Sequence, residues 1–382
     1  MKVKVAVFGC KVNQYEAQVL RENFVNAGDE LVTNLNDADK LVVNTCVVTS
    51  RAESEGLRLA KQGAKKGKEV TITGCFARMD SRSRRQIPET IKSNYPPSLS
   101  SSNQGLESSP SEGGGVGGGD INSCRFKVIP FEEILSQFPE CREKITCFAG
   151  HSRAFLKVED GCSRRCHYCL VSRIRGPVRS RPINEVISEV QGLITNGYRE
   201  IVFSGINLGL YGYNSGLSLT YLLQQILALP DLPAGFKVRL SSLEPDLVKP
   251  DLIDLMATDL RIYPHFHLPL QSGSDRILEK MGRGYTTAEY FSLVNRIRSK
   301  IPNLILTTDL MVGFPGETEE DFQETLDFAK SLGFTKVHIF RFSPRPSTPA
   351  ASFPNPVPET IKKERSTLLK QTLLPVNCHS CG

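Results

Sequence analysis

Short β-branched runs alternate with stretches of helical spacing along most of this chain, and that alternation restricts it to an α/β fold with parallel sheets. Residues 1–75 predict a β-α-β-α-β unit, with strands at 3–8, 41–44 and 70–73 and helices at 13–27 and 52–66. Parallel strands joined by helices require right-handed crossovers, and the carboxyl ends of such strands meet at one edge of the sheet. A Rossmann-like N-terminal domain is therefore expected.

The second half of the chain repeats the same alternation over residues 153–342. The expected strands are 154–158, 200–204, 237–241, 265–270, 304–311 and 336–340, and the expected helices are 183–196, 217–229, 250–257, 288–300 and 319–331. Parallel strands in this number are typical of a partial (β/α) barrel or of a doubly wound sheet, and periodicity does not separate the two.

Composition marks the boundaries between the parts. A stretch rich in Ser and Gly has too little apolar surface to offset the entropy of ordering it, which predicts a disordered insertion. The expected organisation is an N-terminal domain, this insertion, a connector, a second domain and a C-terminal tail, at residues 1–92, 93–122, 123–146, 147–343 and 344–382.

Eleven cysteines stand in a chain that has no secretion pattern and no apolar run long enough for a membrane span. A reducing, cytoplasmic location without membrane contact is expected, and there such a cysteine content points to metal ligation. An organellar location stays open if a targeting peptide precedes Met1. A hydrophobic content of 40% is ordinary for a globular protein.

Three cysteines form a C-x3-C-x2-C loop just after the first expected strand of the second domain: Cys162, Cys166 and Cys169. Three thiolates on one loop hold a metal centre while leaving one coordination position open, as a catalytic site requires. A zinc knuckle completed by His167, or three unrelated thiols, are the alternatives.

Three further cysteines, Cys10, Cys46 and Cys75, each follow an expected N-terminal strand by one or two residues. Because parallel strand ends lie together, these residues are expected to converge. Three separately buried small thiols are the alternative.

The net charge of +6 is less informative than the distribution of the basic residues. Two clusters suit a polyanion such as nucleic acid, although a solvated face explains them equally well. They comprise Arg164, Arg165, Arg173, Arg175, Arg179 and Arg181, and near the C-terminus Lys362, Lys363 and Arg365.

The segment DGCSRRCHYCL resembles the defining loop of the radical S-adenosylmethionine enzymes, with Tyr168 as the aromatic residue of the motif. The resemblance implies a partial (β/α)6 barrel and a [4Fe–4S] cluster on Cys162, Cys166 and Cys169 whose open iron chelates S-adenosylmethionine. It also implies release of a 5′-deoxyadenosyl radical, which abstracts hydrogen inside a water-poor cavity.

The N-terminal pattern GCKVNQYE…NTCVVT…TGCFAR is similar to that of the methylthiotransferases, a branch of the same enzymes. That resemblance implies a second, auxiliary [4Fe–4S] cluster on Cys10, Cys46 and Cys75. Motifs such as RGPVRSRP and TTDLMVGFPGETEEDF favour the subgroup that converts N6-threonylcarbamoyladenosine at position 37 of tRNA, next to the anticodon, to its 2-methylthio derivative. A reducing electron donor protein is then also required.

Two other functions stay open. One is radical methylthiolation of another tRNA adenosine or of a protein side chain, and the other is a non-catalytic Fe–S module that binds RNA.

The family usually ends in a small β-rich RNA-binding domain, which is not expected in the tail 344–382. The same tail holds Cys378 and Cys381, with His379 between them, like half a zinc site.

The resemblance also implies contacts to S-adenosylmethionine at the ends of the barrel strands. A glycine there permits close approach of the backbone to a ligand, and GETEED alternatively has an ordinary helix-capping role. Besides Tyr168, the residues expected at the cofactor are Ser204, Gly205, Asn207, Ser242, Glu244, Gln271, Gly313, Gly316 and Glu317, with Ser272 and Gly273 next to Gln271.

Overall fold

The computed structural model describes residues 1–48, 50–79, 126–148 and 150–373. The expected insertion at 93–122 lies outside these ranges, as do Cys124, Cys378, His379 and Cys381. No helix within the described ranges is both long enough and apolar enough to cross a membrane.

The N-terminal part is a parallel sheet of five strands in the order β2-β1-β3-β4-β5. The expected β-α-β-α-β unit is confirmed, and β2 and β5 are added at the two edges; β5 and the short helix α4 come from the segment expected as a connector. The elements are β1 (Lys2–Phe8), α1 (Lys11–Asn26), β2 (Glu30–Leu31), β3 (Lys40–Thr45), α2 (Ser50–Lys65), β4 (Glu69–Thr73), η1 (Gly74–Arg78), β5 (Phe126–Val128) and α4 (Phe131–Leu135).

The second part is a partial barrel of six parallel strands that follow one another in sequence order. Two three-stranded sheets, β10-β9-β6 and β11-β12-β13, are joined by the parallel bridges Val238↔Ile262 and Ser242↔His267. A doubly wound sheet reverses its strand order, so the sequential order identifies the barrel. The strands are β6 (Ala154–Lys157), β9 (Glu200–Ser204), β10 (Lys237–Leu240), β11 (His265–His267), β12 (Ile305–Val312) and β13 (Lys336–Arg341).

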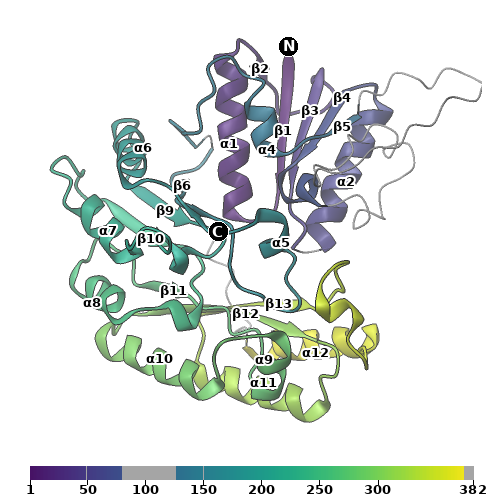
Figure 1. Ribbon diagram of the computed structural model, residues 1–382, viewed down its shortest axis with the longest axis vertical. Helices are drawn as coiled ribbons and strands as arrows, with labels where there is room; N and C mark the ends of the chain where they lie inside the picture. Colours follow the sequence, from purple (N-terminus) through teal and green to yellow (C-terminus); the bar gives the residue numbers. More distant parts are fainter. Residues whose placement is uncertain (49, 80–125, 149, 374–382) are drawn as a thin grey trace, which may run out of the picture.

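Helices surround the outer face of these strands (Figure 1). They are α6 (Ile183–Thr195), α7 (Leu219–Leu227), α8 (Pro250–Thr258), α9 (Asp275–Met281), α10 (Thr287–Lys300), α11 (Glu319–Leu332) and α12 (Glu359–Leu373). Shorter elements are β7 (Glu159–Asp160), α5 (Val171–Arg175), β8 (Arg179–Ser180), η2 (Leu208–Leu210), η3 (Pro245–Leu247) and η4 (Pro349–Ser352).

Local sequence explains where α11 begins and ends. Thr318 and Asp321 form a reciprocal capping box in which each side chain accepts a hydrogen bond from the other residue's backbone N–H. Acidic residues in the first turn complement the helix dipole. The helix stops at Gly333, which has φ of 54° and adopts the left-handed conformation that glycine allows. The capping role expected for GETEED is confirmed.

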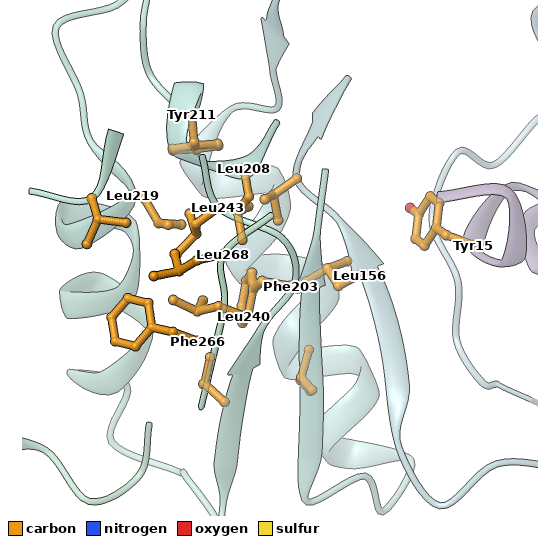
Figure 2. Packing of buried hydrophobic residues seen from close by; sticks show 14 of the residues in the cluster. Tyr15, Leu156, Phe203, Leu208, Tyr211, Leu219, Leu240, Leu243, Phe266 and Leu268 are labelled. Carbon is orange, nitrogen blue, oxygen red and sulfur yellow. The ribbon is translucent and has the colours of Figure 1, made fainter. Parts of the chain in front are cut away.

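A continuous apolar core joins the two parts. Side chains of β9, β10 and β11 pack against the surrounding helices, and Tyr15 of α1 points from the N-terminal part toward β6 (Figure 2). The Tyr15 hydroxyl donates to the Glu143 carbonyl oxygen at 2.8 Å and lies 3.0 Å from Glu189 Oε1 on α6. Helix α1 therefore covers the edge of the barrel and holds the N-terminal sheet against it.

Phe203 of β9 has no exposed surface. Phe203→Ala leaves a cavity between strand and helix and is expected to lower the free energy of unfolding by about 3–5 kcal/mol. Urea unfolding followed by circular dichroism measures this loss. Leu260→Ala, at a side chain that is 79% exposed, is the control and is expected to change stability by less than about 0.5 kcal/mol. Equal losses for the two variants would contradict this account of the core.

Candidate metal-cluster and cofactor site

The structure brings Cys10, Cys46 and Cys75 together. They follow β1, β3 and β4, which are neighbours in the sheet, so the carboxyl ends of these strands place the three thiols side by side. The Cys46 thiol lies within hydrogen-bond range of both Cys10 and Cys75. The convergence expected from the sequence is confirmed. We call these residues the N-terminal triad.

The surroundings of the N-terminal triad favour the thiolate form of Cys75. Cys46 and Cys75 are buried, whereas Cys10 is exposed. Hydrogen bonding with Cys46, and after it the charge of Arg175, lowers the pKa of the Cys75 thiol to about 6, whereas hydrogen bonds with Cys10 and then with Cys75 raise the pKa of Cys46. Cys46 Sγ also accepts from the Val48 backbone N–H at 3.3 Å. Closely placed thiols, one of them readily ionised, match the donor set of an iron–sulfur cluster.

The second triad, Cys162, Cys166 and Cys169, occupies the loop between β7 and α5. Backbone hydrogen bonds shape this loop: Cys162 N donates to the Gly176 carbonyl oxygen at 3.1 Å, and Cys169 N donates to that of Cys166 at 3.0 Å. Burial raises the pKa of Cys162, and it raises the pKa of Cys169 to about 12. A cationic metal centre would stabilise the thiolate form of these cysteines and so offset the effect of burial. We call these residues the barrel triad.

His167 is held away from the sulfurs by other contacts. Its Nδ1 lies 2.8 Å from the Lys280 carbonyl oxygen of α9, and its ring packs edge-on against Phe353. Across the described part of the chain, no three His, Cys, Asp or Glu side chains are placed to hold a single metal ion. The geometry therefore gives no support to the zinc knuckle. The thiolates of an iron–sulfur cluster need no such common point, because they bind separate irons.

Arg283 contacts the barrel triad and was not found from the sequence. Its side chain is 2% exposed, and its Nη1 lies 3.5 Å from Cys166 Sγ and 3.2 Å from the Tyr168 hydroxyl. It also forms a close ion pair with Glu244, one of the residues expected at the cofactor. The arginine lies within GRGYTT, just after α9, and no motif in the sequence distinguishes it from the other arginines.

The residues expected at the end of β9 lie beside Cys162. The Asn207 backbone N–H donates to Glu159 Oε2 at 2.8 Å, and its side-chain nitrogen lies 3.8 Å from Cys162 Sγ. A Cβ at position 205 would lie 2.5 Å from Glu159 Oε2, so the site requires glycine there. Ser204 is buried and bonds the Leu156 carbonyl oxygen.

Two polar atoms at this place are buried without a hydrogen-bond partner in the described ranges, namely Glu159 Oε1 and Asn207 Oδ1. Such atoms cost free energy unless a ligand or water satisfies them. An unsatisfied carboxyl and amide beside a triad of thiols fit a polar, amine-bearing cofactor bound at the cluster.

The remaining expected residues separate into two groups. Ser242 forms one of the two bridges between the barrel sheets, and Gln271, with φ of 68°, lines a cavity. By contrast, buried Glu317 pairs with Arg365 of α12, and a Cβ at Gly313 would lie 2.3 Å from Lys362 Cγ.

These contacts connect the Gly313–Gly316–Glu317 segment to α12, and its contact with a cofactor stays a prediction. Ser272 and Gly273 pack likewise against Thr325 of α11.

A cavity of about 450 Å³ lies between the N-terminal part and the barrel. Val47 and Val48, next to Cys46, line it on one side, and Cys169 lines it on the other. Its further wall includes Arg51, Tyr168, Leu170, Val171, Gln271, Asp309, Met311, Ile339, Phe340, Arg341, Phe342, Ser343, Pro344, Arg345, Glu359 and Lys362.

A row of polar side chains inside the barrel was likewise not predicted from the sequence. Thr307 Oγ1 lies 2.9 Å from His267 Nδ1, and Asp309 Oδ1 lies 3.3 Å from His267 Nε2 and 3.5 Å from His338 Nδ1. His267 lies on β11, Thr307 and Asp309 lie two positions apart on β12, and His338 lies on β13. Side chains two positions apart on a strand point to the same face of the sheet, so Thr307 and Asp309 share one face. Asp309 brings this row to the cavity wall.

The basic clusters are not the open polyanion surface that their charge suggested. Arg175 is 1% exposed, and Lys362 and Arg365 are each 7% exposed. Their hydrogen-bond acceptors are Glu16, the Phe342 carbonyl oxygen and Glu317, respectively. Arg181 is paired with Glu189 at 2.7 Å. These four residues are therefore not free to form a polyanion-binding surface, because each already pairs with a carboxylate or a carbonyl oxygen of the protein. Arg165, Arg173, Arg179 and Lys363 remain exposed.

Family models match both parts of the chain. Residues 156–329 match the Radical SAM superfamily, and residues 2–93 match an uncharacterized protein family, UPF0004. The two matches fall on the barrel and on the N-terminal sheet, and each contains one cysteine triad.

Characterised relatives match almost the whole chain. Threonylcarbamoyladenosine tRNA methylthiotransferase MtaB of Thermotoga maritima is 36% identical over 378 residues, which are 97% of this chain and 81% of that protein. MtaB of Aquifex aeolicus is 35% identical, with 97% and 87% covered. The tRNA-2-methylthio-N(6)-dimethylallyladenosine synthase of Fusobacterium nucleatum is 32% identical, with 95% and 81% covered.

Among solved structures, the fold is similar to that of the radical S-adenosylmethionine methyltransferase TsrM from Kitasatospora setae, with a TM-score of 0.57 and 16% identity. That match covers 92% of this chain and 74% of TsrM. At this identity the likeness concerns the fold alone.

The buried Glu159 carboxyl makes the folding stability of the protein depend on pH. Burial raises its pKa from 4.5 to about 8, so between these values the folded protein holds a proton that the unfolded chain releases. This group therefore destabilises the protein progressively as the pH rises from about 4.5 to about 8. Glu159→Gln is expected to make stability less dependent on pH in this range, measured as urea midpoints at about pH 5 and about pH 8. The control Glu133→Gln, on the exposed side of α4, should keep the wild-type slope; an unchanged slope in Glu159→Gln would contradict the assignment.

Proposed function

The chain belongs to the tRNA methylthiotransferase family of radical S-adenosylmethionine enzymes, and we propose that it converts N6-threonylcarbamoyladenosine at position 37 of tRNA, next to the anticodon, to its 2-methylthio derivative. The observation that carries this proposal is the placement of two cysteine triads at strand ends, with Cys169 of one triad and the residues next to Cys46 of the other lining the same cavity. The proposal assigns the barrel triad to the radical cluster and the N-terminal triad to the auxiliary cluster.

The barrel residues have distinct parts in this proposal. Cys162, Cys166 and Cys169 would hold the [4Fe–4S] cluster, which with bound S-adenosylmethionine would supply the 5′-deoxyadenosyl radical. Asn207 and Glu159 offer their unsatisfied oxygens to the cofactor's amino group. Apolar side chains of the cavity, such as Met311 and Phe340, limit the access of water to a reactive radical.

The N-terminal triad supplies the sulfur side of the reaction in this proposal. Cys10, Cys46 and Cys75 would hold a second [4Fe–4S] cluster, and the cavity lined by Val48 and Cys169 is where the adenine ring would bind. The barrel residues would thus hold the group that supplies the radical chemistry, and the N-terminal residues would hold the group that supplies the sulfur chemistry. The electron donor is a separate reducing protein, and a cytoplasmic location stays a prediction.

The substrate follows from the relatives. Those from Thermotoga maritima and Aquifex aeolicus are named for threonylcarbamoyladenosine, and both are more similar to this chain than the dimethylallyladenosine enzyme from Fusobacterium nucleatum. The latter is still 32% identical, so dimethylallyladenosine in tRNA is the second candidate substrate. Mass spectrometry of tRNA nucleosides from cells with and without the gene distinguishes the two, because the 2-methylthio product that disappears identifies the substrate.

Iron content tests the assignment of the two triads. Anaerobically reconstituted protein is expected to bind about eight irons, because each [4Fe–4S] cluster holds four. Replacing Cys10, Cys46 and Cys75 by Ala should leave about four irons and retain reductive cleavage of S-adenosylmethionine. Replacing Cys162 by Ala should abolish that cleavage. About four irons in the wild-type protein would refute the second cluster, and cleavage by the Cys162→Ala variant would refute the assignment of the barrel triad.

A further inference from the structure

A buried arginine lies against each cysteine triad. Arg175 donates from Nε to Cys75 Sγ at 3.2 Å, and Arg283 Nη1 lies 3.5 Å from Cys166 Sγ. The Arg175 side chain has no exposed surface and that of Arg283 is 2% exposed. Burying a guanidinium is costly unless charges and hydrogen bonds compensate it, so each contact requires a dedicated set of partners.

The partners of Arg175 divide its guanidinium into two ends. Nη1 lies 2.8 Å from Glu16 Oε1 and 3.0 Å from Asp160 Oδ1, and Nη2 lies 3.2 Å from Glu16 Oε2. Lys157 approaches the same two carboxylates at 3.5 and 3.3 Å. The carboxylates thus anchor the Nη end, and the Nε–H is directed at the sulfur. An arginine that served only to join α1 to the barrel would need the first set of contacts and not the second.

The position of Arg175 connects the two sites. It lies on α5, directly after the loop of the barrel triad, but its sulfur contact belongs to the N-terminal triad. Hydrogen bonds to the sulfurs are among the features that set the reduction potential of an iron–sulfur cluster, and a nearby positive charge favours the reduced, more negative form. The structure therefore places a cation that hydrogen bonds a sulfur of the N-terminal triad on the helix that follows the loop of the barrel triad.

We propose that Arg175 is a positioning residue that hydrogen bonds a ligand sulfur of the auxiliary cluster and raises the reduction potential of that cluster, while Arg283 does the same at the radical cluster. This inference rests on the proposed function, because it requires the N-terminal triad to hold a cluster. It assigns the two arginines to separate centres, so replacing one changes the potential of one centre alone.

The test measures each cluster in the absence of the other. The parent protein carries Cys162→Ala, Cys166→Ala and Cys169→Ala and retains only the auxiliary cluster, whose midpoint potential is followed by electron paramagnetic resonance during a redox titration. Adding Arg175→Gln is expected to lower that potential. Arg181→Gln is the matched control, because Arg181 is paired with Glu189 at 2.7 Å and hydrogen bonds Tyr15 and the Lys157 carbonyl oxygen, with no bond to a cysteine among the described residues; it should leave the potential unchanged.

The reciprocal measurement uses protein with Cys10, Cys46 and Cys75 replaced by Ala. There Arg283→Gln should lower the potential of the radical cluster, and Arg175→Gln should not. Equal potentials for Arg175→Gln and its parent would overturn the proposal, as would a shift of the same size in the Arg181→Gln control.

A further variant covers the case in which Arg175→Gln binds no iron. Arg175→Lys keeps a cation in the pocket but lacks the Nε–H, and its potential is expected to lie below that of the parent. Failure of both Arg175 variants to bind iron, with normal loading of Arg181→Gln, would overturn the proposal, because Arg175 would then be required for cluster assembly. A parent that binds no iron would instead refute the auxiliary cluster of the proposed function.

Discussion

An ion pair buried between α1 and α5 fixes the arrangement on which both cysteine triads depend. Glu16 and Arg175 have no exposed side-chain surface, and they join a helix of the N-terminal part to the helix that follows the barrel triad. Removing one partner of such a pair leaves an uncompensated buried charge at a cost of about 3–5 kcal/mol. The relative position of the two parts, and with it that of the two triads, is therefore held by a contact that tolerates little displacement.

Parallel sheets supply the second constraint. The N-terminal triad follows the carboxyl ends of β1, β3 and β4, and the barrel triad follows β6 and β7. Loops at these ends are the usual ligand sites of α/β folds because they are free of core packing. Helix α1, seated on the edge of the barrel, brings one set of strand ends toward the other (Figure 1). The cavity between Val48 and Cys169 is the result.

Much of this was predictable from the sequence, for physical reasons. Cysteines that follow strands by one or two residues must meet at the sheet edge, so the convergence of Cys10, Cys46 and Cys75 required only the strand positions and a parallel sheet. The six strands of the barrel and the helices α6, α7, α8, α10 and α11 were expected within a few residues, because their apolar periodicity is strong, whereas α9 was not expected. The sequence could not distinguish a barrel from a doubly wound sheet, because the two differ in strand order. The bridges at Val238 and Ser242 reveal that order.

The unpredicted features are long-range contacts. Arg175 and Lys362 belong to basic runs in the sequence. Only the fold shows that both are buried and that each is hydrogen bonded to a carboxylate or a carbonyl oxygen. Arg283 reaches Cys166 across more than one hundred positions, and the polar row at Asp309 depends on strand register. Local patterns carry no information on such partners, because a charged side chain has the same local sequence whether it is solvated or paired.

The central claim is that two iron–sulfur centres face one cavity, and the magnetic interaction between them tests it most directly. Electron paramagnetic resonance spectra of the fully reconstituted, reduced protein are compared with spectra of the two variants that each lack one cysteine triad. The account predicts additional splitting or broadening in the complete protein, because two unpaired spins on either side of a nucleobase-sized cavity interact. A spectrum equal to the sum of the spectra of the two variants would contradict it.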